Sequence, residues 1–171
     1  APFAYAGWNT NKYCLPELWD AQRKALAITN TGMAVVTDIG NLRDIHPRRK
    51  VQVGERLALW ALAKTYGKKD IVYSGPLFAS MAPEGAKLRI KFDHVGGGLV
   101  GREGKSLSWF EIAGEDGIFT QASAIKDGDT VVVESGEVLK PFKVRYGWAA
   151  EAEVELSNKA GLPASPFQAS L

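Results

Sequence analysis

The chain has 171 residues, of which 46% are hydrophobic and 23% are charged. These proportions are typical of globular proteins and exclude a disordered chain, and no apolar run approaches the length that a bilayer requires. The net charge is +2 with both signs interspersed, so the sequence indicates neither nucleic-acid nor membrane binding. A single cysteine, Cys14, excludes an internal disulfide and a thiol-rich metal site, and we expect no metal and no cofactor.

The first part of the chain predicts a helix, a strand, a loop and a second helix. Residues 15–26 carry apolar side chains at helical spacing. Residues 32–37 form an apolar, β-branched run that predicts a buried strand. Residues 47–66 again have helical spacing, and Gly67 is placed to cap that helix. This order predicts a piece of an α/β sheet whose other strands come from elsewhere.

The second part of the chain has the pattern of antiparallel strands. Residues 87–93 and 142–146 alternate between apolar and polar side chains. Residues 118–125 and 130–134 are two further strand candidates, and residues 126–129 between them have the composition of a hairpin turn. Alternation of this kind predicts a sheet with one face in water. We therefore expect a β-sandwich or a sheet that packs on the rest of the protein.

The change of pattern predicts two domains. Residues 1–69 would be a part of an α/β domain, and residues 70–171 would be an antiparallel, β-sandwich-like module. One strand cannot make a complete sheet, so we also expect an exposed apolar patch on the first domain and a partner that covers it.

The loop between the predicted strand and the second helix contains a cluster of titratable residues. His46 is one of two histidines in the chain, and Asp38 and Asp44 precede it in the same loop. A carboxylate that fixes the tautomer of an imidazole allows the ring to act as a general base. The same residues also suit a structural loop, in which the aspartates are turn or cap residues and His46 precedes a helix. Composition alone favours the structural interpretation.

Longer motifs change that balance. Asp44-Ile45-His46-Pro47 is followed by a basic residue and then by Val53-Gly54-Glu55-Arg56-Leu57-Ala58. This block resembles the last conserved block of the SGNH hydrolases and, more narrowly, that of the bacterial sialate O-acetylesterases. Further segments resemble these esterases in the expected order along nearly the whole chain: residues 15–23, 30–35, 73–77, 110–114, 144–148 and 161–167.

The resemblance implies a serine esterase that removes O-acetyl groups from sialic acid or a related acetylated carbohydrate. His46 would be its catalytic histidine, and residues 1–69 would be the C-terminal remnant of a three-layer α/β/α SGNH domain. These esterases carry their nucleophilic serine in a Gly-Asp-Ser or Gly-Gln-Ser block upstream of the histidine, and this sequence contains no such block. The chain thus resembles the C-terminal portion of such an enzyme, whose partner is the upstream part that carries the serine. The resemblance also implies a periplasmic or secreted location.

One departure from the SGNH pattern leaves the third member of the triad open. The family places its carboxylate three residues before the histidine, where this chain has Arg43. Asp44 could serve instead, Asp38 could reach the ring from the end of the strand, or a backbone carbonyl could hold it. Two other functions also remain open: a carbohydrate-binding or structural accessory module without catalysis of its own, and an esterase that acts on acetylated xylan.

Overall fold

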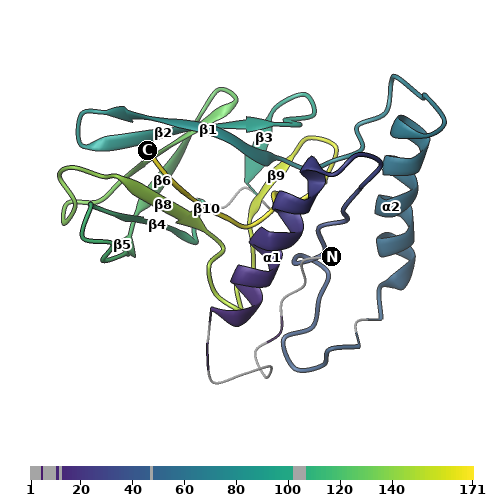
Figure 1. Ribbon diagram of the computed structural model, residues 1–171, viewed down its shortest axis with the longest axis horizontal. Coiled ribbons are helices and arrows are strands. Elements are labelled where there is room, and N and C mark those ends of the chain that lie inside the picture. The colour runs from purple at the N-terminus through teal and green to yellow at the C-terminus, as the bar shows by residue number, and fades with distance from the viewer. Residues whose placement is uncertain (1–4, 6–10, 12, 47, 102–106) are drawn as a thin grey trace.

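Two α-helices precede ten strands in the part of the chain that the structure describes (Figure 1). The structure, a computed structural model, describes residues 5, 11, 13–46, 48–101 and 107–171. The helices are α1 (Cys14–Lys24), followed by the short 3-10 helix η1 (Ala25–Ala27), and α2 (Lys50–Lys64). The strands are β1 (Leu77–Glu84), β2 (Lys87–Asp93), β3 (Leu99–Gly101), β4 (Phe110–Ala113), β5 (Thr120–Gln121), β6 (Ser123–Asp127), β7 (Thr130–Glu134), β8 (Lys143–Tyr146), β9 (Leu156–Asn158) and β10 (Phe167–Ser170). The chain is therefore a mixed α/β structure in which strands predominate.

The strands form antiparallel sheets. One four-stranded sheet has the order β1-β2-β7-β6, and a second has the order β10-β8-β4-β5. β3 and β9 form a separate two-stranded sheet. All of these pairs are antiparallel, as the alternating sequence pattern predicts.

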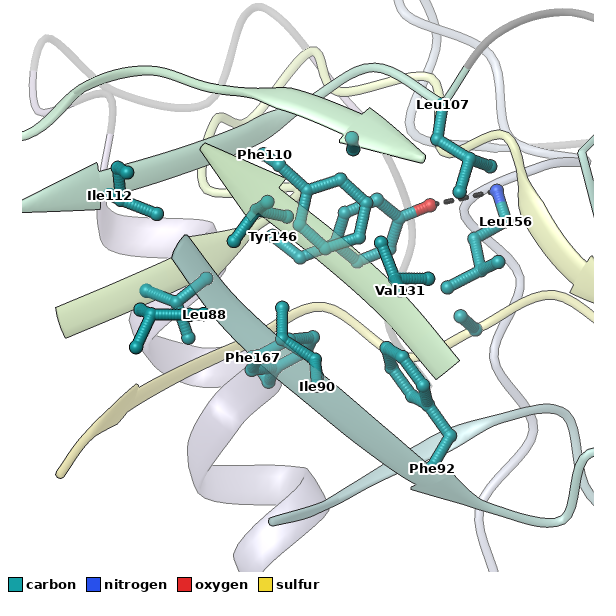
Figure 2. Close-up of a cluster of buried hydrophobic side chains, with 14 of the residues drawn as sticks. Leu88, Ile90, Phe92, Leu107, Phe110, Ile112, Val131, Tyr146, Leu156 and Phe167 are labelled. Atoms are coloured by element: carbon teal, nitrogen blue, oxygen red, sulfur yellow. Dashed lines mark hydrogen bonds between the residues drawn. The ribbon is translucent and has the colours of Figure 1, made fainter. Parts of the chain in front are cut away.

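The two four-stranded sheets share one apolar core, which Figure 2 shows. In β2, Leu88, Ile90 and Phe92 are buried because alternate side chains of a strand point to the same face. Strands of both sheets complete this cluster with Ala124, Val131, Val133, Phe110, Ile112, Val144, Tyr146 and Phe167. Each large side chain buried in this way contributes about 1.5–3 kcal/mol to folding.

The helices lie to one side of these sheets (Figure 1). Leu15 and Trp19 lie one turn apart on the same face of α1, are buried, and contact Ala150. α2 contains no buried residue, although Val53 packs against the buried side chains of Ala34, Val36 and Ile39. Large apolar side chains of these helices and their flanks are exposed, among them Leu18, Ile28, Val51 and Leu57.

Several predicted elements form where the sequence places them. β2 and β7 have the predicted bounds, residues 87–93 and 130–134. The hairpin turn between β6 and β7 is also confirmed, since Asp127 pairs with Thr130 and Gly128 has a φ of +59°. Both helices form as well, although α2 begins at Lys50 and the predicted first residue, Pro47, lies outside the described residues.

Two strand predictions need correction. Residues 33–37 are buried, but they pair with no strand in the described part of the chain, so the strand predicted there is not formed. An apolar run becomes a strand only when a neighbouring strand bonds its backbone. Residues 118–125 do not form one strand either: β5 pairs with β4 in one sheet, and β6 pairs with β7 in the other. The chain changes sheets at Ala122, whose N–H donates to the carbonyl oxygen of Phe110.

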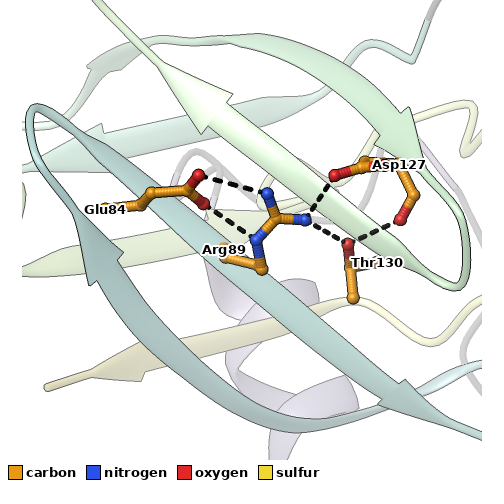
Figure 3. A network of polar contacts seen from close by, with 4 residues as sticks. All are labelled: Glu84, Arg89, Asp127 and Thr130. Atoms are coloured by element: carbon orange, nitrogen blue, oxygen red, sulfur yellow. Dashed lines mark hydrogen bonds and ion pairs between the residues drawn. The ribbon is translucent and has the colours of Figure 1, made fainter.

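The outer face of one sheet has a network of charged side chains, shown in Figure 3. Arg89 bonds Glu84 with Nε to Oε2 at 2.8 Å, and Asp127 with Nη1 to Oδ2 at 2.7 Å. The Thr130 hydroxyl accepts a further bond from Arg89 at 2.9 Å. These contacts join β1, β2, β6 and β7 across their polar faces, which is the usual arrangement for a sheet with one face in water.

Neither helix of the described chain is long and apolar enough to cross a membrane.

Candidate functional site

The loop that contains His46 begins at Asp38, which is held by Arg56 of α2. Arg56 donates from Nη1 to Oδ1 of Asp38 and from Nη2 to Oδ2, each at 2.7 Å. Its Nη1 also donates to the carbonyl oxygen of Val35 at 2.5 Å. The two charged side chains are largely buried, with 13% of Arg56 and 18% of Asp38 exposed. Both carboxylate oxygens of Asp38 are thus bonded to a guanidinium, and Asp38 makes no bond to His46.

His46 is paired instead with Asp44. Nδ1 of His46 lies 3.1 Å from Oδ1 of Asp44, and the backbone N–H of His46 donates to the same oxygen at 2.8 Å. The two side chains are exposed, at 79% for His46 and 51% for Asp44. With a proton on Nδ1, this contact leaves Nε2 as an acceptor, and Nε2 has no partner among the described residues.

The same contacts account for the acidity of Asp44. The hydrogen bond from the backbone N–H of His46 is the main cause that lowers the pKa of the Asp44 carboxyl, and the His46 ring lowers it further. The carboxylate form is therefore favoured, which is the form that can orient an imidazole and stabilise its charged state. The turn that Asp44 forms with His46 also brings the two side chains together, because an aspartate that accepts the N–H two residues on folds the chain back on itself.

A cavity of about 500 Å³ lies beside this loop. Thr37, Ile39 and Asn41 line it together with Asp38, Arg43, Arg48 and Arg49, but neither His46 nor Asp44 does. The cavity has more cationic than anionic side chains, because three arginines line it together with Glu153 and with Asp38, whose carboxylate Arg56 already binds. Two of the arginines stand just before the first residue of α2. The positive end of a helix adds to this excess of positive charge.

A larger cavity, of about 870 Å³, lies in the β-rich part of the chain and is separate from the His46 loop. It is lined by Pro83, Ile118, Leu139 and Phe142, together with the acidic Glu115, Asp116 and Glu137. Its lining contains no histidine, and its titratable side chains are three carboxylates and Lys140.

The second histidine, His94, has a packing role. Its ring is half-buried against Tyr73, with ring centroids 4.9 Å apart, and Trp60 lies next to both. Burial lowers the pKa of His94. Its backbone has a φ of +59° directly after β2, and its carbonyl oxygen accepts a bond from Asn158. His94 thus lies at the end of a strand, and its ring packs among aromatic side chains.

Sequence reasoning missed Arg56. The structure shows that this residue, rather than His46, is the partner of Asp38. A signal was present, because Arg56 belongs to the block quoted above for its resemblance to the esterases, but sequence alone does not show what an arginine on the following helix contacts. No group of three or more His, Cys, Asp or Glu side chains in the described ranges could hold a metal ion.

Comparisons with known proteins found a match among solved structures. No family model matches the chain, and no curated protein matches it. The chain is similar to a crystal structure described as that of a novel carbohydrate acetylesterase from Xanthomonas citri, with a TM-score of 0.92 and 40% sequence identity. The match covers 99% of this chain but 40% of that protein, so the chain spans less than half the length of its neighbour. Over that length, the chain shares the fold of part of a carbohydrate acetylesterase.

Proposed function

We propose that this chain is part of a serine esterase that removes O-acetyl groups from sialic acid or a related acetylated carbohydrate, and that it supplies the catalytic histidine. The observation that carries the proposal is the Asp44–His46 pair, in which a carboxylate lies 3.1 Å from Nδ1 while the ring is 79% exposed. The similarity to a carbohydrate acetylesterase supports the class of reaction. Asp44 is the carboxylate of the proposed triad, because Asp38 is already bonded to Arg56.

In the proposed reaction, His46 transfers protons for a serine that lies in another part of the enzyme. The serine hydroxyl attacks the carbonyl carbon of the acetyl ester while Nε2 of His46 takes its proton. His46 then gives this proton to the departing sugar oxygen, which leaves as a hydroxyl, and the acetyl group remains on the serine. A water molecule next attacks the acetyl-serine, gives its proton to Nε2, and releases acetate as the serine is restored.

The surface of the helices supports the proposal of a partner. Leu18, Ile28, Val51 and Leu57 are exposed, and two of them, Ile28 and Leu57, line one hollow together with Leu26 and Trp60. Apolar side chains that gather at one place on a surface are typical of a site that a partner covers. The partner we propose is the upstream part of the same enzyme, which carries the serine and completes the α/β/α domain of SGNH type. The proposed location, periplasmic or secreted, rests on the resemblance to bacterial sialate O-acetylesterases alone.

The substrate preference follows from the cavity beside the loop. Arg43, Arg48 and Arg49 line it, and no ion pair engages these side chains in the described structure, so they outnumber the carboxylate of Glu153 in the same lining. An acidic sugar would find charge complementarity there. We therefore place sialic acid first among the substrates and neutral acetylated sugars, such as those of acetylated xylan, second.

The test is acetate release by the enzyme assembled from this chain and its serine-bearing part. The substrates are 9-O-acetylated sialic acid, acetylated xylan and p-nitrophenyl acetate. We expect His46→Ala and Asp44→Asn to remove most activity on all three, while His94→Gln and Asp129→Asn serve as matched controls that keep it. Full activity of His46→Ala would refute the catalytic role. Faster release from xylan than from sialic acid would reverse the substrate order.

A second candidate is a carbohydrate-binding role for the β-rich part. It is favoured by the 870 Å³ cavity, which is far larger than a water site and lies on elements with their own complete core. Calorimetric titration of the chain with acetylated and deacetylated sugars tests it. Binding that Leu139→Asp abolishes and His46→Ala leaves unchanged would favour this role.

A further inference from the structure

Arg56 makes three hydrogen bonds from a single guanidinium, all to the segment that leads into the His46 loop. Two go to the carboxylate of Asp38, the first residue of the loop, and one goes to the backbone of Val35. Bidentate bonds from a guanidinium to a carboxylate are directional, so they fix orientation as well as distance. With 13% and 18% of the side chains exposed, solvent competes little for these bonds.

The remainder of the loop is attached weakly to the rest of the protein. The N–H of Asp44 donates to the carbonyl oxygen of Asn41, and the N–H of Arg43 donates to the side chain of the same residue. Within the described ranges, Asp44 is the one residue to which His46 is hydrogen-bonded. Among the described residues, the loop's other link to the body is Ile39, whose N–H bonds Val36 and whose side chain packs with Val53.

Arg56 also connects the two ends of the loop. It lies in the second turn of α2, and α2 begins a few residues after His46. Asp38 is the first residue of the loop, so the Arg56–Asp38 contact closes a ring of chain that contains Asp44 and His46. Any shift of α2 relative to Asp38 must be taken up within this ring, because little else restrains it.

We propose that Arg56 is a positioning residue, which holds the ends of the loop at a fixed separation and thereby keeps the carboxylate of Asp44 on the ring of His46. This role of Arg56 rests on the proposed function, in which the Asp44–His46 pair transfers protons. The effect of Arg56 on the geometry of the loop can be measured without any hydrolysis. Asp38 then has a role other than catalysis, as the carboxylate that Arg56 binds.

The test compares Arg56 with a matched arginine elsewhere in the chain. Arg145 makes a similar fork with Glu111, at 2.7 and 3.0 Å, with 10% and 20% of the side chains exposed. That pair joins β4 to β8, remote in sequence from the loop. Arg56→Gln, Arg56→Lys, Asp38→Asn and Arg145→Gln are compared with the wild type in this 171-residue chain. Hydrogen exchange reports on the amides of Asp44 and His46, and NMR titration reports on the Asp44 carboxyl.

For Arg56→Gln and Asp38→Asn, we expect exchange at these two amides to become about tenfold faster, the effect of losing one charged hydrogen bond, while exchange in β2 and β7 stays unchanged. The pKa of Asp44 should rise toward its ordinary value as its bonds from His46 loosen. Arg56→Lys should be intermediate, because an ammonium keeps the charge but not the fork. Arg145→Gln should leave both readouts as in the wild type, even where it lowers overall stability.

Two results would overturn the inference. One is that the amide exchange rates of Asp44 and His46 and the pKa of Asp44 stay at their wild-type values in both Asp38→Asn and Arg56→Lys. These two substitutions are mild enough to fold even if Arg56→Gln does not. The other is an equal change in Arg145→Gln, which would mean that the loop follows global stability. Neither outcome depends on acetate release, so failure here is distinct from failure of the proposed esterase.

Discussion

Tyr146 allows the shared core to be tested by removing a single oxygen atom. Its side chain is fully buried, and its ring packs against Phe110 with centroids 4.5 Å apart. Its hydroxyl accepts a hydrogen bond from the backbone N–H of Leu156 at 3.0 Å (Figure 2). Tyr146→Phe keeps the ring but leaves that buried N–H without its partner. We expect the free energy of unfolding at pH 8 to fall by about 1–3 kcal/mol.

The same substitution has a predicted pH dependence. Burial raises the pKa of the Tyr146 phenol well above its ordinary value of 10.0, because the charged form cannot be solvated in the core. In the unfolded chain the phenol ionises near that ordinary value. The contribution of the neutral Tyr146 phenol to the free energy of unfolding is therefore fully present below the unfolded pKa, near 10. It is lost as the pH rises from there toward the raised pKa of the folded state. At pH 11 this loss amounts to about 1.4 kcal/mol in the wild type, and phenylalanine does not ionise.

The gap in stability between wild type and Tyr146→Phe should thus shrink by that amount between pH 8 and pH 11. Urea unfolding followed by tryptophan fluorescence measures it at both pH values, and ionisations common to both proteins cancel in the difference. Tyr66→Phe is the control, because Tyr66 is 71% exposed and should show neither effect. Equal stabilities at pH 8, or a gap that is the same at pH 11, would refute the account of this hydroxyl.

Three further predictions concern other parts of the structure. Leu88 is fully buried in the shared core, so Leu88→Ala should lower the free energy of unfolding by about 2–5 kcal/mol in a urea titration. Asn158 is also fully buried and bonds Ser74, His94 and Leu162 through its amide, so Asn158→Leu should cost about 3 kcal/mol or more by leaving these backbone groups unpaired. Asp44 should titrate below its ordinary pKa of 3.8 by NMR, and His46→Ala should raise that pKa, because the ring no longer favours the carboxylate. The stability that Asp44 contributes is present above its unfolded pKa and is lost as the pH falls through the lowered value.

The β-rich part shows where local sequence is sufficient. β2 and β7 alternate strictly, and a turn with Gly128 connects β7 to its neighbour, so both the strands and the hairpin follow from residues close in sequence. The division of residues 118–125 between two sheets does not follow in this way. It depends on which strand lies beside each half, and those strands, β4 and β7, come from different parts of the chain.

β1 shows a second limit. It is an edge strand with mostly exposed or half-exposed side chains and an irregular register between Phe78 and Ser80. Its sequence therefore lacks the alternation that identifies β2, and it was not predicted. Residues 33–37 show the reverse, since they have the composition of a buried strand and are buried, but no described strand lies beside them. In both cases, strand pairing depends on residues that are distant in the sequence.

The two aspartates of the loop differ for the same reason. By sequence, Asp44 is the first candidate for the carboxylate that orients His46, and Asp38 is the second. Asp38 does not take that role, because Arg56 bonds both of its carboxylate oxygens. Arg56 is eighteen residues later in the chain, and α2 brings it to Asp38. Asp44 is assigned by a contact over two residues, which the turn itself creates. A carboxylate held by a guanidinium would have to break a largely buried ion pair to reach the imidazole, and breaking such a pair is costly. The exposed carboxylate of Asp44 has no such pair to break, so it remains the stronger candidate even though it departs from the spacing of the SGNH pattern.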